Sequence, residues 1–141
     1  METTPDIIAR NVEKTNIWFS DFADELRTDD RQYAYRVLRG FLHTLRDRLG
    51  VEEAAQLAAQ MPDLIRGIYF EGWTPAKTPA KYRDVDVFLD RLANEALLHG
   101  RTEASFAASA CARALRRHVS AGELDDVAAA LPKEVEQLIM H

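Results

Sequence analysis

The feature that most constrains the fold is an internal repeat. When the sequence is aligned without a gap against a copy of itself shifted by a constant number of residues, Ala23 falls on Ala93, Arg31 on Arg101 and Pro62 on Pro132. The residues that are identical in both copies are, in the first copy, Ala23, Glu25, Arg31, Ala34, Leu45, Arg46, Glu53, Ala58, Ala59 and Pro62. A unit that recurs in this way packs against its copy and shares a core with it. We therefore predict a single domain over residues 1–141, with one repeat at about 5–73, a linker at about 74–81 and a second repeat at about 82–141.

Apolar residues within the first repeat recur at the spacing of an α-helix. Thr4-Pro5-Asp6 predicts a helix start with Thr4 as the cap, and we expect this helix from about residue 5 to 27. Its predicted core stripe, at alternating steps of four and three residues, consists of Ile8, Val12, Thr15, Phe19, Phe22 and Leu26. A stripe of this kind is typical of a helix that packs on a core along its length.

Capping signals divide the rest of each repeat into further helices. Asp29 with Gln32 predicts the N-cap of the second helix, and Pro62 predicts the start of the fourth. Ser120 with Glu123 predicts a cap in the second repeat. No alternating run between hairpin turns indicates a strand. The sequence therefore predicts an all-α protein, a helical bundle of two pseudo-equivalent four-helix repeats with about eight helices.

The segment between the repeats contains one tetrad twice. Thr74-Pro75-Ala76-Lys77 is followed at once by Thr78-Pro79-Ala80-Lys81. Two prolines four residues apart favour an extended, semi-rigid connection. We interpret the segment as a linker, and a basic, phosphorylatable segment is the alternative.

Charge and composition exclude several classes of protein. The formal charge is −5 and the pI is about 5.4, which argues against a nucleic-acid coat or a binder of anionic membranes. No apolar run approaches the ~20 residues of a membrane span, and residues 1–6 lack the basic and apolar regions of a secretory signal. The single cysteine, Cys111, excludes an internal disulfide and a cysteine zinc site. We expect a cytoplasmic protein.

Three segments of the chain resemble a known family. They are Glu13-Lys14-Thr15-Asn16-Ile17-Trp18, the stretch from Ala34 to Leu49, and the stretch from Leu64 to Trp73. Together they resemble the DUF2267 family over nearly the whole chain, more strongly in the first repeat. The resemblance implies a small bacterial or archaeal all-helical protein of duplicated units. It implies no activity and no catalytic residues, because the family is a domain of unknown function.

Signals for catalysis and for metal binding are absent from the sequence. No two of His43, His99, His118 and His141 lie three or four residues apart. His43 and Asp47 are four apart on one helix, and we interpret them as an exposed pair rather than half of a metal site. Cys111 takes the place of Phe41 in the repeat, which indicates a small core residue. We predict no catalytic residue, no metal and no cofactor.

Basic residues line one edge of the second helix of each repeat. Arg36, Arg39, His43 and Arg46 lie within about 80° of one another on a helix. The corresponding helix carries Arg113, Arg116 and Arg117. Such strips can bind phosphates. Because acids flank them, we interpret them as solvated faces with local ion pairs.

Aromatic residues are concentrated in the first repeat, where residues 1–73 hold nine of the twelve. Tyr33 and Tyr35 cannot both face a core. The surplus predicts a surface for a partner, and the alternative is that the segment Gly72-Trp73 folds back over the aromatic rings. The candidate partner- or ligand-binding residues are Arg66, Tyr69, Glu71, Trp73, His43 and Arg46.

Three functions remain open on these observations. The first is a non-catalytic helical interaction or self-association module, with a protein partner or a second copy of the chain as its ligand. The alternative is a small anionic-ligand binder or enzyme that uses the crevice between the repeats, where Arg66 and Arg46 would contact the anion. A nucleic-acid role through the basic edges ranks third.

Overall fold

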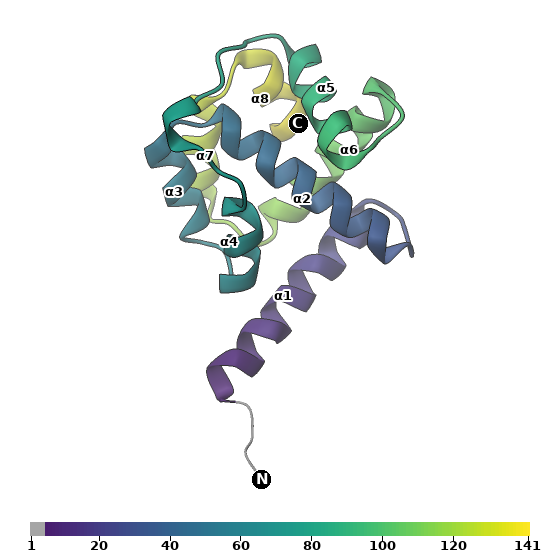
Figure 1. Cartoon of the computed structure of the whole chain (residues 1–141), viewed down its shortest axis with the longest axis vertical. Helices are drawn as coiled ribbons and strands as arrows, with labels where there is room; N and C mark the ends of the chain where they lie inside the picture. Colours follow the sequence, from purple (N-terminus) through teal and green to yellow (C-terminus); the bar gives the residue numbers. More distant parts are fainter. Residues whose placement is uncertain (1–4) are drawn as a thin grey trace.

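Residues 5–141, which the computed structural model describes, form eight α-helices and one 3-10 helix, with no strand (Figure 1). The helices are α1 (Asp6–Glu25), α2 (Arg31–Arg48), α3 (Val51–Ala58), α4 (Asp63–Phe70), η1 (Pro75–Lys77), α5 (Val85–Ala96), α6 (Arg101–Arg116), α7 (Ala121–Ala130) and α8 (Lys133–Met140). The predicted all-α class is therefore confirmed. Within this range no helix is both long enough and apolar enough to cross a membrane.

Helix boundaries recur along the chain. The helices α2, α3 and α4 begin at residues 31, 51 and 63, and α6, α7 and α8 begin at residues 101, 121 and 133, which is the shift that relates the two sequence repeats. The first helices differ, since α5 begins at residue 85 whereas the same shift places the counterpart of the α1 start at residue 76. Thus α5 lacks the first nine residues of α1 (85 − 76). Whether the two halves superpose as backbones stays a prediction.

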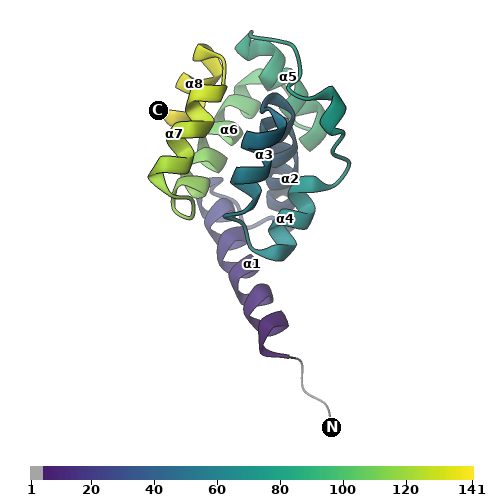
Figure 2. The same ribbon diagram turned by 90° about the vertical axis from the view of Figure 1, so that its left-hand side faces the viewer.

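Each half packs its first helix against the second helix of the other half. The helix α2 lies against α5, α1 lies against α6, and α3 meets α7 (Figure 2). Between them lies one shared core whose large, fully buried side chains include Phe22, Phe41, Leu45, Phe88, Leu92 and Leu115. Cys111 is completely buried among them, as predicted for a small core residue. Both halves therefore contribute apolar side chains to one core.

The capping residues agree with the sequence at one site and differ at another. Ser120 accepts a hydrogen bond from the Glu123 amide at 3.2 Å, as predicted. The cap of α2 is Asp30, which accepts from the Tyr33 amide at 3.1 Å, and not Asp29. The helix starts one residue later than expected because Thr28 Oγ1 already accepts from the Asp30 amide. The predicted cap Thr4 lies outside the described residues.

The first half of α1 extends beyond the rest of the molecule. In both ribbon views its N-terminal turns project away from the body (Figures 1 and 2). Phe22 and Leu26, at the other end of the predicted stripe, are buried. Ile8 and Val12 were predicted to join them in the core, and this was wrong: both are about half exposed. The stripe continues in sequence, but the body that would cover it ends near Trp18.

The connection between α4 and α5 is not the extended linker that the prolines suggested. It folds into the 3-10 turn η1, in which the Lys77 amide donates to Thr74 O at 2.9 Å. Farther along, the Ala80 amide donates to Asp47 O at 2.7 Å and attaches the segment to the end of α2. The connection is thus a largely exposed loop that backbone hydrogen bonds in the turn and to α2 hold in place.

Candidate functional site

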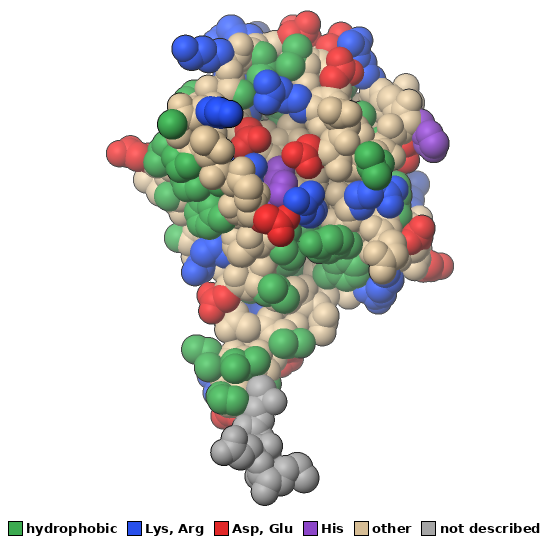
Figure 3. Space-filling view, in the orientation of Figure 1, with side chains coloured by type: hydrophobic (Ala, Val, Ile, Leu, Met, Phe, Trp, Pro, Cys, Tyr) green, Lys and Arg blue, Asp and Glu red, His purple; other side chains and the backbone are tan. Residues whose placement is uncertain are grey.

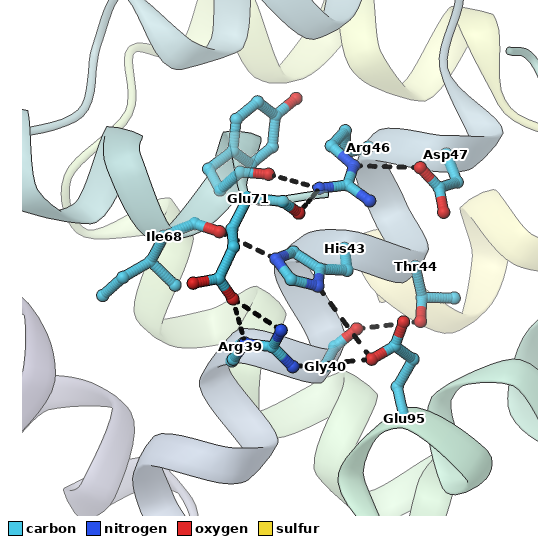
Figure 4. Close-up of polar contacts among 10 residues, drawn as sticks. Arg39, Gly40, His43, Thr44, Arg46, Asp47, Ile68, Glu71 and Glu95 are labelled. Carbon is cyan, nitrogen blue, oxygen red and sulfur yellow. Dashed lines mark hydrogen bonds and ion pairs between the residues drawn. The ribbon is translucent and has the colours of Figure 1, made fainter. Parts of the chain in front are cut away.

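Two of the predicted residues, His43 and Glu71, meet in a polar cluster that also contains Arg39 and Glu95 (Figure 4). Arg39 and His43 lie one turn apart on α2, Glu71 follows the end of α4, and Glu95 lies on α5. Sequence reasoning missed Glu95, because nothing in the sequence brings α5 next to the basic edge of α2. The cluster joins three elements at one place on the surface.

His43 is the buried member of this cluster, with an exposed fraction of 2%. Its Nε2 lies 2.7 Å from the carbonyl oxygen of Ile68, so Nε2 carries the proton and donates it. The other ring nitrogen, Nδ1, faces a Glu95 carboxylate oxygen at 4.0 Å. Burial lowers the pKa of His43, and the hydrogen bond to Ile68 partly opposes this effect. The predicted exposed pair with Asp47 is therefore wrong, because the ring turns inward to the end of α4.

Arg39 holds the two carboxylates of the cluster. Its Nε donates to Glu71 Oε1 at 2.7 Å, and its Nη1 lies 3.7 Å from Glu95. The hydrogen bond from Arg39 lowers the pKa of Glu71, so this carboxylate is charged at neutral pH. Because all three side chains are partly exposed, solvent screens these ion pairs and each contributes little to stability.

Arg46 is buried and fully engaged by its own chain. Its Nη1 donates to the carbonyl oxygens of Tyr69 at 2.8 Å and Glu71 at 2.7 Å, and its Nε donates to Asp47 at 2.9 Å. The last carbonyls of a helix have no partner within the helix, and Arg46 supplies one for α4. With 3% of its surface exposed, Arg46 cannot reach a ligand. The hypothesis that Arg46 contacts an anion therefore loses its support.

Tyr69 is a core residue rather than a surface anchor. Its ring is completely buried, and its hydroxyl donates to Ala54 O at 3.0 Å. Burial raises the pKa of Tyr69 well above its ordinary value. The hydroxyl is therefore a fixed donor that ties α4 to α3.

Arg66 lies apart from the cluster, in the first half of α4, and its side chain reaches back to the turn between α3 and α4. Its Nε donates to Ala58 O and its Nη2 to Met61 O, both at 2.9 Å, while Nη1 lies 3.4 Å from Asp63. Two of its nitrogens thus satisfy the last carbonyl of α3 and a carbonyl of the turn that follows. The structure does not bring Arg66 and Arg46 together in a crevice.

Trp73 folds back onto the helix that precedes it. Gly72 has a φ of +72°, a conformation that glycine adopts readily, and it reverses the chain after α4. The Trp73 ring then packs on Phe70 at 4.9 Å between centroids and is half-buried. Its indole nitrogen is buried without a hydrogen-bond partner among the described residues. This geometry favours the alternative in which Gly72-Trp73 covers the surplus aromatic rings.

The basic edges of α2 and α6 are also engaged by the protein itself. Arg36 Nε donates to Ala96 O at 2.6 Å, and Arg116 Nη1 donates to Ile139 O. Arg113 and Arg117 both bind Glu25. The contacts with Glu25 support the interpretation of local ion pairs, and Arg36 and Arg116 add hydrogen bonds to backbone carbonyls.

Chemically, the cluster can hold a proton and position helices. In the part of the chain that the structure describes, the polar contacts of His43 are a carbonyl and a carboxylate, and neither a hydroxyl nor a thiol bonds to it. Over residues 5–141, no group of three His, Cys, Asp or Glu side chains is arranged to hold a metal ion. The cluster therefore fastens α4 and α5 to α2.

An exposed aliphatic surface is the feature that sequence reasoning missed. Ile7, Ile8, Val12 and Leu64 are 66%, 52%, 51% and 54% exposed. They line a groove of about 470 Å³ between α1 and the start of α4. The Asp63 amide donates to Asn11 Oδ1 at 3.1 Å and fixes the two helices beside this groove. Hydrophobic side chains gather over the projecting end of α1 (Figure 3). We call these four residues the α1 patch.

Comparison with known families gives one match. The model of the family described as "Uncharacterized conserved protein (DUF2267)" matches residues 15–138, nearly the whole chain. The protein belongs to this family. Comparison with curated proteins gives no match.

Proposed function

We propose that this DUF2267 protein is a non-catalytic helical interaction module that associates with a second copy of itself through the α1 patch. The observation that carries the proposal is the set of four large aliphatic side chains, each more than half exposed, on two neighbouring helices. Contiguous exposed apolar surface of this kind marks interaction sites in soluble proteins. The sequence suggested a partner surface around Trp73, and we now propose that it lies at the projecting end of α1.

The projecting part of α1 gains stability from a partner. It extends a helix that packs on the body only at its other end, so its free turns have no packing to hold them and can fray. Residues 6–14 are α-helical, yet their counterparts at residues 76–84 are not. The extra turns of α1 carry Ile8 and Val12 on the same side as the buried Phe22. A second copy of the chain would cover Ile8 and Val12, which the body of the protein leaves exposed.

The charges around the α1 patch favour a copy of this chain over a charged partner. Residues 6–17 carry two acids, Asp6 and Glu13, and two bases, Arg10 and Lys14, so their net charge is zero (2 − 2) in a chain of charge −5. Nucleic acids and anionic membranes require an excess of Lys and Arg. A neutral apolar surface can meet its own copy around a two-fold axis without repulsion between like charges.

The small extent of the α1 patch sets the strength of this association. Twelve helical residues span only about 18 Å, whereas a stable interface buries roughly 800 Å² on each partner. We therefore expect a weak dimer whose population depends on protein concentration.

Sedimentation velocity over a concentration series tests the proposal. The sedimentation coefficient of the wild type is expected to rise with concentration, and Ile8→Asp and Val12→Asp are expected to keep the protein monomeric. Leu97→Asp is the matched control: Leu97 is 72% exposed and follows the end of α5, so it lies outside α1 and α4. A wild type that stays monomeric, or an equal effect of Leu97→Asp, would contradict the proposal.

We also propose that the two halves arose by internal duplication. The constant shift between the helix starts of the two halves supports this, and so does a repeated contact. Arg46 donates to Tyr69 O, Arg116 donates to Ile139 O, and the same shift relates both ends of these two hydrogen bonds. The lone cysteine, Cys111, supports a reducing compartment such as the cytoplasm of a bacterium or archaeon.

A further inference from the structure

The repeated tetrad Thr-Pro-Ala-Lys surrounds a cavity that the proposed self-association does not use. Four polar side chains of the two tetrads, Thr74, Lys77, Thr78 and Lys81, line one cavity of about 330 Å³. Asp47 at the end of α2 and Arg91 on α5 complete its polar lining. The segment passes from the end of α4 to the start of α5 along the C-terminal end of α2 (Figure 1).

The wall that the tetrads form is fixed by hydrogen bonds. The Thr78 amide and its hydroxyl both donate to Pro75 O, at 3.1 and 2.8 Å. The Ala80 amide donates to Asp47 O at 2.7 Å. Lys77 and Lys81 therefore project from a loop that the chain itself holds in shape, which lowers the cost of ordering it around a ligand.

The cavity carries an excess of positive charge. Within residues 5–141, none of Lys77, Lys81 and Arg91 lies within 4.0 Å of a carboxylate oxygen. The single acid of the lining, Asp47, already binds Arg46 at 2.9 Å. Three cations thus line the cavity with a single carboxylate, whose charge Arg46 balances. This contrasts with Arg39 and Arg46, whose charges are balanced by acids next to them.

Arg91 is held in position by an aromatic ring. Its guanidinium lies 5.0 Å from the centroid of the Tyr82 ring, and that of Arg48 lies 5.5 Å from the same centroid. Arg48 Nε also donates to Tyr82 O at 2.9 Å, which fixes the tyrosine. A guanidinium placed over an aromatic face keeps its planar donors free for an oxyanion.

From this geometry we propose that the cavity binds a small phosphorylated molecule. Arginine presents paired donors to phosphate oxygens, lysine ammonium groups supply point charges, and threonine hydroxyls add neutral hydrogen bonds. The volume of about 330 Å³ is about ten times the ~30 Å³ share of one water molecule, so it has room for a phosphoryl group and a small organic part. The site is separate from the α1 patch, and its test does not depend on self-association.

The test is calorimetric titration of the wild-type protein with pyrophosphate in a buffer of constant ionic strength. Saturable binding is expected, and Lys77→Gln/Lys81→Gln and Arg91→Gln are each expected to weaken it at least about tenfold, because each removes a charge-assisted contact. Lys14→Gln and Lys133→Gln remove exposed lysines elsewhere and are expected to leave the affinity unchanged. Circular dichroism checks that every variant stays folded.

Citrate serves as the second titrant, because carboxylates share the charge of phosphates but not their tetrahedral geometry. Weaker binding of citrate than of pyrophosphate supports a phosphoryl site, and tighter binding of citrate overturns it. Absence of saturable pyrophosphate binding overturns the proposal. An equal loss of affinity in Lys14→Gln would also do so, because it would locate the anion beside α1 and Arg66, where Lys14 lines another polar cleft.

Discussion

Arg46 Nη1 lies 2.8 Å from the carbonyl oxygen of Tyr69, and this hydrogen bond closes the C-terminal end of α4 against α2. The same donor also reaches Glu71 O at 2.7 Å. One buried cation therefore satisfies two carbonyls that α4 leaves without partners. In the second half Arg116 performs the same task for α8 through Ile139 O.

We expect Arg46→Ala to lower the free energy of unfolding by about 2–3 kcal/mol, because hydrogen bonds to charged groups are strong and the carbonyls lose their partner. Arg116→Ala should cost about 1–2 kcal/mol, since Arg116 is less buried and satisfies one carbonyl. Arg46→Lys keeps the charge but not the geometry of the guanidinium and should remain destabilised. Urea denaturation measures all three. A loss under about 0.5 kcal/mol for Arg46→Ala would show that water replaces the contact.

Core substitutions should separate clearly from surface ones. Phe22→Ala and Leu45→Ala are each expected to cost about 2–5 kcal/mol, because both side chains are completely buried. The sequence placed Arg36 on a solvated face, but its hydrogen bond to Ala96 O raises the expected cost of Arg36→Ala to about 1 kcal/mol. Lys133→Ala is the exposed control, within about 0.5 kcal/mol of wild type. Equal denaturation midpoints for Phe22→Ala and Lys133→Ala would refute this assignment of the core.

Stability should fall when the pH drops below the ordinary pKa of histidine, about 6.5. Burial lowers the pKa of His43 in the folded protein, so the unfolded chain takes up this proton first. Acidification through this window therefore favours unfolding, and the stabilising effect of the neutral ring is present above it. The groups that face the ring are Arg39, Arg46, Glu95 and the Ile68 carbonyl.

Comparison of His43→Gln with the wild type at about pH 7.5 and about pH 5.5 isolates this effect, since most carboxylates titrate below that range. The variant should lose less stability than the wild type between these two values. His99→Gln removes an exposed imidazole and is the matched control. Parallel losses in wild type and His43→Gln would mean that His43 holds its proton equally in both states.

Trp73→Ala should affect stability rather than association. The ring packs on Phe70 and covers the end of α4, so its removal should cost about 1–3 kcal/mol. Ile8→Asp should have the opposite profile, with little loss of stability and a loss of self-association. Thermal denaturation and sedimentation of both variants separate the two roles. If Trp73→Ala dissociated the dimer without changing stability, the result would favour the aromatic partner surface that the sequence suggested.

Local patterns in the sequence were enough to predict the all-α fold. The helical spacing of apolar residues, the caps at Ser120 and Pro62, and the register of the internal repeat located eight helices and the buried Cys111. These features are properties of the sequence itself, so they can be read without tertiary structure. The sequence could not tell which of the adjacent residues Asp29 and Asp30 caps α2, because either aspartate is a suitable cap, and the cap is Asp30.

The site could not be predicted in the same way, because its partners are distant in sequence. Arg46 bonds to carbonyls 23 and 25 residues away, and backbone carbonyls leave no mark in the sequence. Ile8 and Val12 follow the same stripe as Phe22, so periodicity alone assigns all three to the core. Whether a residue of this stripe is buried depends on whether the other helices extend far enough to cover it, and this is a property of the tertiary structure.

Hydrogen exchange of residues 6–14 at low and high protein concentration tests most directly whether the projecting end of α1 is a docking surface. In the monomer these amides should exchange almost as fast as in an unfolded chain, because the free, unpacked end of a helix frays at little cost. At high concentration their protection should increase, while Val12→Asp should remain unprotected. Exchange of residues 6–14 that is the same at both concentrations would contradict self-association through α1.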